Sequence, residues 1–179
     1  TGKKIKKIRT WNEVSTVTYT QVLQRPAMAE IDHPIFSSLG LRSDMMLQGI
    51  SATLAKPYLK CMKNFKPVKK AGELMLPLVI PQSFAEIAYA YGMINNLPIL
   101  KPSDIIGLKL KLILGRSIIG TKAGPLEEIK GTICGFVPNS YLAAVGVPVT
   151  YTQRAQNKLG QSIAADSYDQ IFVTVKDAS

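Results

Sequence analysis

The chain has 179 residues, of which 46% are hydrophobic and 19% charged, with two cysteines and one histidine. This length suits a single domain, and the apolar fraction excludes a disordered chain. Two cysteines are too few for a scaffold held by several disulfides, and one histidine argues against His-based triads and most metal hydrolases. We therefore expect a folded domain that is not an enzyme and that holds no metal and no cofactor.

The net charge of +10 is concentrated in two short segments without acidic residues. The N-terminal basic segment, residues 1–9, carries Lys3, Lys4, Lys6, Lys7 and Arg9. The central basic segment, residues 56–70, carries Lys56, Lys60, Lys63, Lys66, Lys69 and Lys70. These 24 positions hold 11 of the 22 basic residues, and the other 155 positions are almost neutral. Clustered like charges repel unless a polyanion neutralises them, so all eleven cations are candidate contacts for a partner.

The N-terminal basic segment has too few apolar residues to fold alone, and we interpret it as a flexible arm ahead of one β-rich domain over residues 10–179. Nucleic acid, DNA or RNA, is the commonest partner of such an arm, through counterion release at its phosphates. Two alternatives stay open. The basic segments could be solvated faces that keep the protein soluble. They could also contact an anionic membrane, for which Ile5 and Ile8 are a weak anchor.

The first elements after the arm are two predicted strands. Residues 11–23 alternate Thr with Val, Tyr and Leu, which indicates a strand with one solvated face. Pro26 ends this strand, a second strand is expected over 27–31, and a loop over 32–42.

A helix is expected next. Ser43 is a plausible N-cap, and Met46, Ile50 and Leu54 recur at helical spacing. Pro57 ends this helix and can begin another, which would place Lys56, Lys60 and Lys63 on one stripe.

The rest of the chain alternates short apolar runs with glycine and proline. Pro77 should push the strand that contains it toward a sheet edge or a bulge. Two helices are expected, over 83–93 and 153–163. Further strands are expected over 74–80, 108–114, 117–121, 129–136, 143–151 and 171–175.

About eight strands with two or three helices predict a mainly β, α+β fold, a mainly antiparallel sandwich or barrel with helical insertions. Residues 87–100 and 131–153 carry no charge. Buried core strands and subunit interfaces both explain these stretches. The prolines and polar residues of 131–153 make it a poor transmembrane helix, so no membrane span is expected.

No catalytic motif is complete. Residues 115–122 nearly spell a phosphate-binding loop, but Thr and Lys are transposed and no helix follows. Residues 160–164 are one substitution from a nucleophile elbow, but its strand–turn–helix context is missing and the single histidine, His33, lies far upstream. Asp166 and Asp169 fit turn chemistry better than a cation site.

The two cysteines, Cys61 and Cys134, are far apart in sequence and outside any C-x-x-C pattern. We interpret them as reduced, partly buried thiols. The basic start has no apolar region of a secretory signal behind it, so intracellular synthesis is expected.

A basic arm followed by about eight strands with intervening helices resembles the layout of small viral coat proteins, although no motif identifies a family. In those proteins the strands form an antiparallel β-sandwich of jelly-roll type, which is the fold that the resemblance implies. The resemblance implies a capsid subunit whose arm meets packaged nucleic acid in the virion. It also implies that much of the neutral remainder, with a mean hydropathy of +0.11, is buried between copies of the chain. The alternative is a stand-alone single-stranded nucleic-acid-binding module of β-barrel (OB-like) type, with Trp11, Tyr58 and Phe65 stacking on bases.

Overall fold

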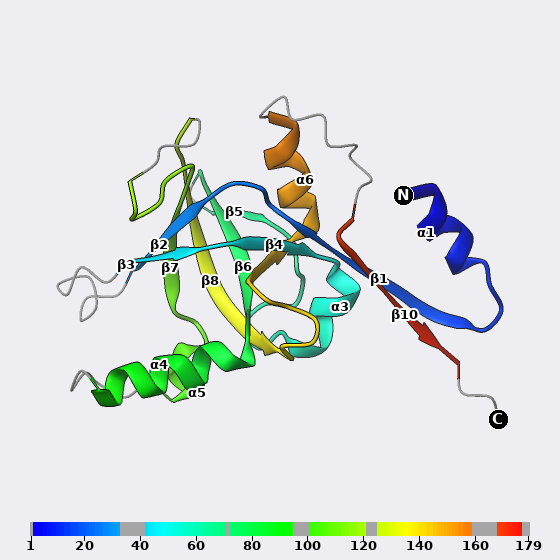
Figure 1. The fold of residues 1–179 in the computed structure, drawn as a ribbon, viewed down its shortest axis with the longest axis horizontal. Coiled ribbons are helices and arrows are strands. Elements are labelled where there is room, and N and C mark those ends of the chain that lie inside the picture. The colour runs from blue at the N-terminus through cyan, green and yellow to red at the C-terminus, as the bar shows by residue number, and fades with distance from the viewer. Residues whose placement is uncertain are drawn as a thin grey trace.

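The structure is a computed structural model that describes residues 2–32, 42–70, 72–94, 101–120, 125–158 and 168–176 (Figure 1). In the first half of the chain the elements are α1 (Gly2–Arg9), β1 (Val14–Val22), β2 (Ala27–Ile31), β3 (Arg42–Met45), β4 (Leu47–Ile50), α3 (Ala52–Ala55), the short 3-10 helix η1 (Lys56–Tyr58), β5 (Val68–Lys70) and β6 (Glu73–Pro81). In the second half they are α4 (Gln82–Ile94), α5 (Pro102–Ile105), β7 (Lys109–Leu114), β8 (Glu127–Val137), β9 (Val145–Pro148), α6 (Val149–Lys158) and β10 (Gln170–Val175).

All ten described strands belong to one mixed sheet, which confirms a β-rich α+β fold. The strand order is β10-β1-β4-β9-β6-β8-β7-β2-β3, and β5 pairs with β6 off this path. Most neighbouring strands pair antiparallel, as expected, but β4 pairs in parallel with β9 and β6 in parallel with β8. Long connections, which include α4, α5 and β7 between β6 and β8, allow this parallel pairing. A two-sheet jelly roll is not confirmed.

The sheet carries a hydrophobic core on each face. Along β6, Leu78 belongs to the larger core and its neighbour Val79 to the smaller one, as expected when successive side chains point to opposite faces. Tyr151 of α6 packs in the larger core and Leu54 of α3 in the smaller one. These two helices therefore cover opposite faces of the sheet.

Six predicted strands are confirmed, with ends shifted by a few residues. In β7, Leu110, Leu112 and Leu114 are buried while Lys109 is exposed, as the alternating pattern requires. The other five lie over 11–23, 27–31, 74–80, 129–136 and 171–175. The predicted helix over 83–93 is confirmed as α4.

The helix expected from Ser43 to Pro57 is wrong. β3 and β4 occupy the first half of that range, and every residue of β4 is buried. β4 lies between β1 and β9, and pairing on both sides outweighs the helical spacing of its apolar residues. Only Ala52–Ala55 and the adjoining 3-10 helix are helical.

Pro77 does not place its strand at an edge, because β6 pairs with β8 on one side and with β5 and β9 on the other. The alternative, an irregularity, is found: the register against β8 shifts between Leu78 and Val79. The uncharged residues 131–149 are mostly buried within the chain, which favours the core interpretation for them.

Two further predictions, the strand–helix boundary after residue 143 and the strand over 117–121, are also wrong. The strand expected over 143–151 ends at Pro148, where α6 begins, earlier than the helix expected over 153–163. Residues 117–120 form a turn instead of a strand, because the Asp44 carboxylate accepts hydrogen bonds from the Ser117 hydroxyl (2.6 Å) and the Ile118 amide (2.7 Å). Within the described residues no helix is long and apolar enough to cross a membrane.

Candidate nucleic-acid interface

The N-terminal basic segment forms the helix α1, so the expected flexible arm is not confirmed. Ile5 is only 5% exposed and Ile8 is half-buried. α1 packs against β1, and this contact supplies the stability that a short isolated helix lacks. The division into residues 1–9 and a domain over 10–179 stays a prediction.

The described cations of α1 keep their side chains exposed, although Arg9 reaches back to β1, where its Nη2 donates to the Val17 carbonyl at 3.5 Å. The side chains of Lys4, Lys6, Lys7 and Arg9 are exposed; that of Lys3 lies outside the description. Lys6, Lys7 and Arg9 fall in the last turn, where the helix dipole favours positive charge. One buried isoleucine thus holds a compact group of cations at the surface.

A turn after α1 fixes its orientation. The Thr10 hydroxyl donates to the Lys7 carbonyl at 2.7 Å, and the Trp11 amide donates to the Ile8 carbonyl at 3.2 Å. Beside Arg9 lies a hollow of about 360 Å³ that includes the hydroxyl-bearing residues Ser15, Thr16 and Thr53. Hydroxyls next to a guanidinium suit the oxygens of a phosphate.

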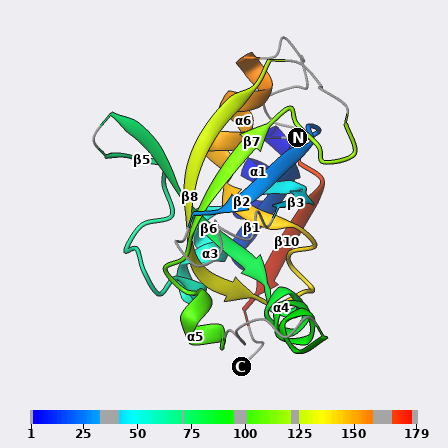
Figure 2. The same cartoon turned by 90° about the vertical axis from the view of Figure 1, so that its left-hand side faces the viewer.

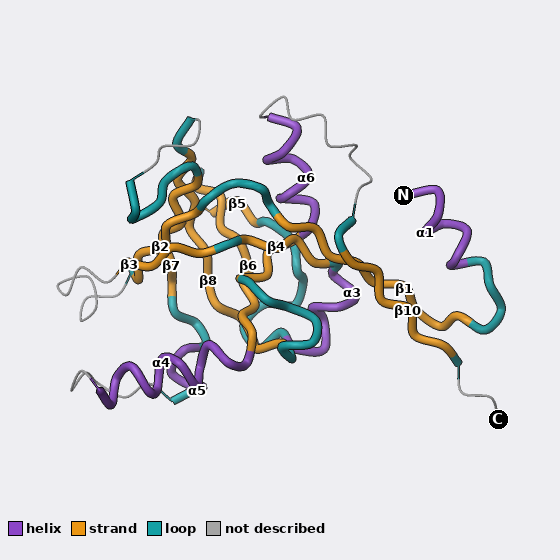
Figure 3. The backbone as a smooth tube through the Cα atoms, in the orientation of Figure 1, coloured by secondary structure: helices purple, strands orange, loops and turns teal. Residues whose placement is uncertain are grey.

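The central basic segment runs from η1 to β5 as a long connection (Figure 3). The lysines of this segment with exposed side chains are Lys56, Lys60, Lys63, Lys66 and Lys69. Lys70 lies in β5, and its side chain is outside the description. The helical stripe expected for the first three lysines is not formed, because η1 ends at Tyr58.

This connection is fixed to β8 by backbone contacts. The Lys60 amide donates to the Cys134 carbonyl at 2.7 Å. The Tyr58 carbonyl oxygen lies so close to Gly135 that a Cβ there would meet it at 1.9 Å. Phe65, in the second half of the segment, is 4% exposed and packs in the smaller core. The lysines are therefore displayed on an anchored loop.

Cys61 and Cys134 form a disulfide, so the expectation of two reduced thiols is wrong. The bond spans a sequence separation of 73 residues and joins the exposed Cys61 to Cys134, which is fully buried in β8. No spacing pattern in the sequence indicates this pair, because only the fold brings the loop onto β8.

The cations of the two basic segments differ from several cations elsewhere on the sheet. Lys111 pairs with Glu128 at 3.0 Å, Lys130 with Glu73 at 2.7 Å and Arg42 with Glu30 at 2.7 Å. The Glu73 carboxylate raises the pKa of Lys130. The structure records no salt bridge for the described cations of either basic segment. Their charge is thus available to an external anion.

The aromatic residues expected to stack on bases are placed unequally. Trp11 is 52% exposed, directly after α1. Tyr58 is half-buried, and Phe65 is buried in the smaller core and cannot reach a base in this arrangement. Of the three, Trp11 alone combines high exposure with a neighbouring group of cations.

The central basic segment begins next to α3, whose Thr53 lines the same hollow as Arg9, and ends at β5, away from α1. α1 lies beside β1 and β10, whereas β5 lies apart from it in both views (Figures 1 and 2). A partner that contacts both α1 and β5 must therefore extend along the molecule, as a polymer does, or must contact them through different copies.

The described residues give no support to the incomplete catalytic motifs of the sequence. Residues 115–120 of the loop-like motif form the turn held by Asp44. The Asp169 carboxylate accepts a hydrogen bond from the Val22 amide at the end of β1, which is a long-range contact, so the local turn expected around Asp166 and Asp169 stays a prediction. Residues 160–164, His33 and Asp166 lie outside the described residues.

No protein-family model matches this chain, and no curated protein matches it. The assignment of a function therefore rests on the charge, exposure and contacts of its own residues.

Proposed function

We propose that the protein is a self-assembling structural protein, a viral capsid or coat subunit, that contacts nucleic acid through its two basic segments. The observation that carries the proposal is the display of exposed cations without salt bridges on α1 and on the anchored central segment. Because these groups meet phosphates, binding should not depend on base sequence and should weaken steeply with salt. The proposal needs no catalytic residue.

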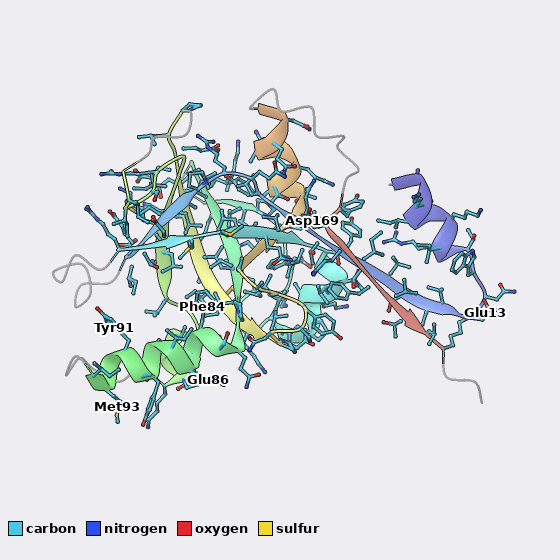
Figure 4. All side chains as sticks on the ribbon, in the orientation of Figure 1. Glu13, Phe84, Glu86, Tyr91, Met93 and Asp169 are labelled. Carbon is cyan, nitrogen blue, oxygen red and sulfur yellow. A yellow bond between two sulfur atoms is a disulfide. The ribbon has the colours of Figure 1, made fainter. Side chains whose placement is uncertain are left out.

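The helix α4 supports the assembly part of the proposal. It lies at one end of the sheet, and Phe84 points toward the sheet while Met93 points away from it (Figure 4). Five large side chains of α4 are at least 49% exposed: Ile87, Tyr89, Tyr91, Met93 and Ile94. Several large apolar side chains exposed on one helix are typical of interaction sites. Between copies with a charge of +10, a helix with no basic residue is a suitable contact.

The disulfide also fits this proposal. Disulfides persist in oxidising surroundings, virion surfaces among them, and are rare in the cytosol. A subunit made inside the cell and then carried in a particle would form the Cys61–Cys134 bond after assembly or release.

The second candidate function, a stand-alone single-strand binding module, rests on the exposed Trp11 next to α1. The burial of Phe65 removes one of its three stacking groups. Contact with an anionic membrane is supported less, because Ile5, one of the two anchors, is buried against the protein.

Charging the exposed face of α4 should break assembly. In the variant Ile87→Lys/Ile94→Lys, two residues that are 63% and 80% exposed bring four positive charges into each contact between two copies. We expect light scattering to show a shift of the assembly to monomers. The melting temperature should stay nearly unchanged, because neither residue is in the core.

The matched control is Ile118→Lys/Ile119→Lys, which adds the same charge at residues that are 52% and 90% exposed outside α4. This control should assemble like the wild type. Assemblies of equal mass in both variants would exclude α4 as the contact between copies.

A further inference from the structure

A small pocket of about 190 Å³ lies where α6 meets the β5–β6 hairpin and the start of β8. Its lining residues are Lys69, Leu74, Glu127, Tyr151, Arg154 and Ala155. The pocket is too small for a base or a drug-sized molecule and has room for a single charged group with a few attached atoms.

The Tyr151 hydroxyl is an unsatisfied donor in this lining. Tyr151 is 3% exposed, and its hydroxyl has no hydrogen-bond partner in the part of the chain that the structure describes. Burial, followed by the nearby Glu127 carboxylate, raises the pKa of Tyr151, so the hydroxyl keeps its proton at neutral pH. Buried hydroxyls are nearly always hydrogen-bonded, and this one is free to donate to a ligand.

Arg25 adds a second unsatisfied group close by. It lies between β1 and β2 and is 7% exposed, and its Nε and Nη2 atoms have no partner among the described residues. The positive charges of Arg25 and Arg154 both act to lower the pKa of Tyr151. A guanidinium stays charged in proteins, and leaving its buried N–H donors without acceptors is unfavourable. The arrangement therefore calls for an anion.

The balance of charge around the pocket indicates which anion. Lys69 and Arg154 in the lining and Arg25 beside it supply three positive charges, against one negative charge from Glu127. An excess of two positive charges matches a phosphate monoester, which carries close to two negative charges at neutral pH. Its oxygens accept from guanidinium groups and from a hydroxyl together.

We propose that this pocket binds a phosphate group between Tyr151, Arg154 and Lys69, with Arg25 as the buried counter-charge. The group could belong to free phosphate or to the terminal phosphate of a nucleic acid strand, and both present the same chemistry. The inference does not depend on the proposed function, because only Lys69 is shared with a basic segment.

The first test is a titration of the full chain with inorganic phosphate at constant ionic strength. Binding is measured by calorimetry and by the change in melting temperature. We expect saturable binding of one phosphate by the wild type. Tyr151→Phe should weaken it about tenfold, the typical effect of losing one hydrogen bond to a charged group. Without phosphate this variant should melt no lower than the wild type, because it lacks an unsatisfied buried hydroxyl.

Two matched controls separate the pocket from general effects. Tyr141→Phe removes a hydroxyl from a half-buried residue at the smaller core, on the opposite face of the sheet, and Lys101→Gln removes an exposed charge outside the pocket lining. Neither should change phosphate affinity, whereas Arg154→Gln should weaken it. Equal phosphate affinity in the wild type and Tyr151→Phe, or no stabilisation beyond that given by chloride, would overturn the proposal.

The source of the phosphate is decided with one oligonucleotide, prepared with and without a 5′-phosphate. If the strand is the source, the 5′-phosphate should strengthen binding to the wild type and not to Tyr151→Phe. If inorganic phosphate alone binds, the pocket is a site for free phosphate. Binding of the unphosphorylated strand reports separately on the basic segments, so failure of the two proposals can be told apart.

Discussion

Replacing Lys4, Lys6 and Lys7 of α1 by glutamine is expected to reduce the salt dependence of nucleic acid binding. Each lysine that neutralises a phosphate contributes roughly 0.7 to 0.9 to the slope of log K against log salt. The triple variant should therefore lose about 2 to 3 from the slope, with affinity at low salt at least roughly tenfold weaker. Fluorescence anisotropy with labelled oligonucleotides of unrelated sequence, over a series of salt concentrations, measures both quantities.

The control for this variant removes the same charge elsewhere. Lys101, Lys109 and Arg116 are exposed and lie outside both basic segments, and their replacement by glutamine should leave the slope nearly unchanged. All six positions are exposed, so both variants should fold normally. Equal losses of affinity in the two variants would show that net charge, and not α1, governs binding.

Of the variants described, one that breaks the disulfide should lose the most free energy of unfolding. The bond closes a loop with a sequence separation of 73 residues. Cross-links over such a loop stabilise by about 4 kcal/mol in the chain-entropy account. Cys61→Ser breaks the bond at its exposed end and leaves Cys134 as a small buried apolar side chain. We expect the free energy of unfolding to fall by about 2–4 kcal/mol, measured by denaturant titration.

A reducing agent provides the internal control for this prediction. It should lower the stability of the wild type to that of Cys61→Ser and should not affect the variant. A native wild-type protein with two free thiols, and with the same stability as the variant, would contradict the disulfide.

The sequence predicts well where side-chain pattern and local pairing agree. The alternation of leucine and lysine in 108–114 is that of β7, which pairs along its whole length with β8. It fails where distant parts of the chain decide the structure. β4 is a strand because β1 and β9 enclose it, although its apolar residues are spaced as in a helix. Parallel pairing of β6 with β8 has no local signature either.

The same division applies to the candidate interface. The positions of the cations are visible in the sequence, because charge clustering needs no knowledge of the fold. Their presentation is not visible. Because Ile5 is buried, the expected flexible arm is a helix packed against the sheet. The contacts of the central segment with Cys134 and Gly135 depend on β8 lying next to that segment. The pocket at Tyr151 is assembled from β5, β6, β8 and α6 and has no motif of its own.

The most direct test of the central claim is size-exclusion chromatography of the wild type with light scattering and absorbance at about 260 and 280 nm, at low and high salt. The account predicts a large, uniform assembly that carries nucleic acid at low salt and loses it at high salt, because phosphate contacts are screened. A small species free of nucleic acid at low salt would contradict both the assembly and the role of the basic segments.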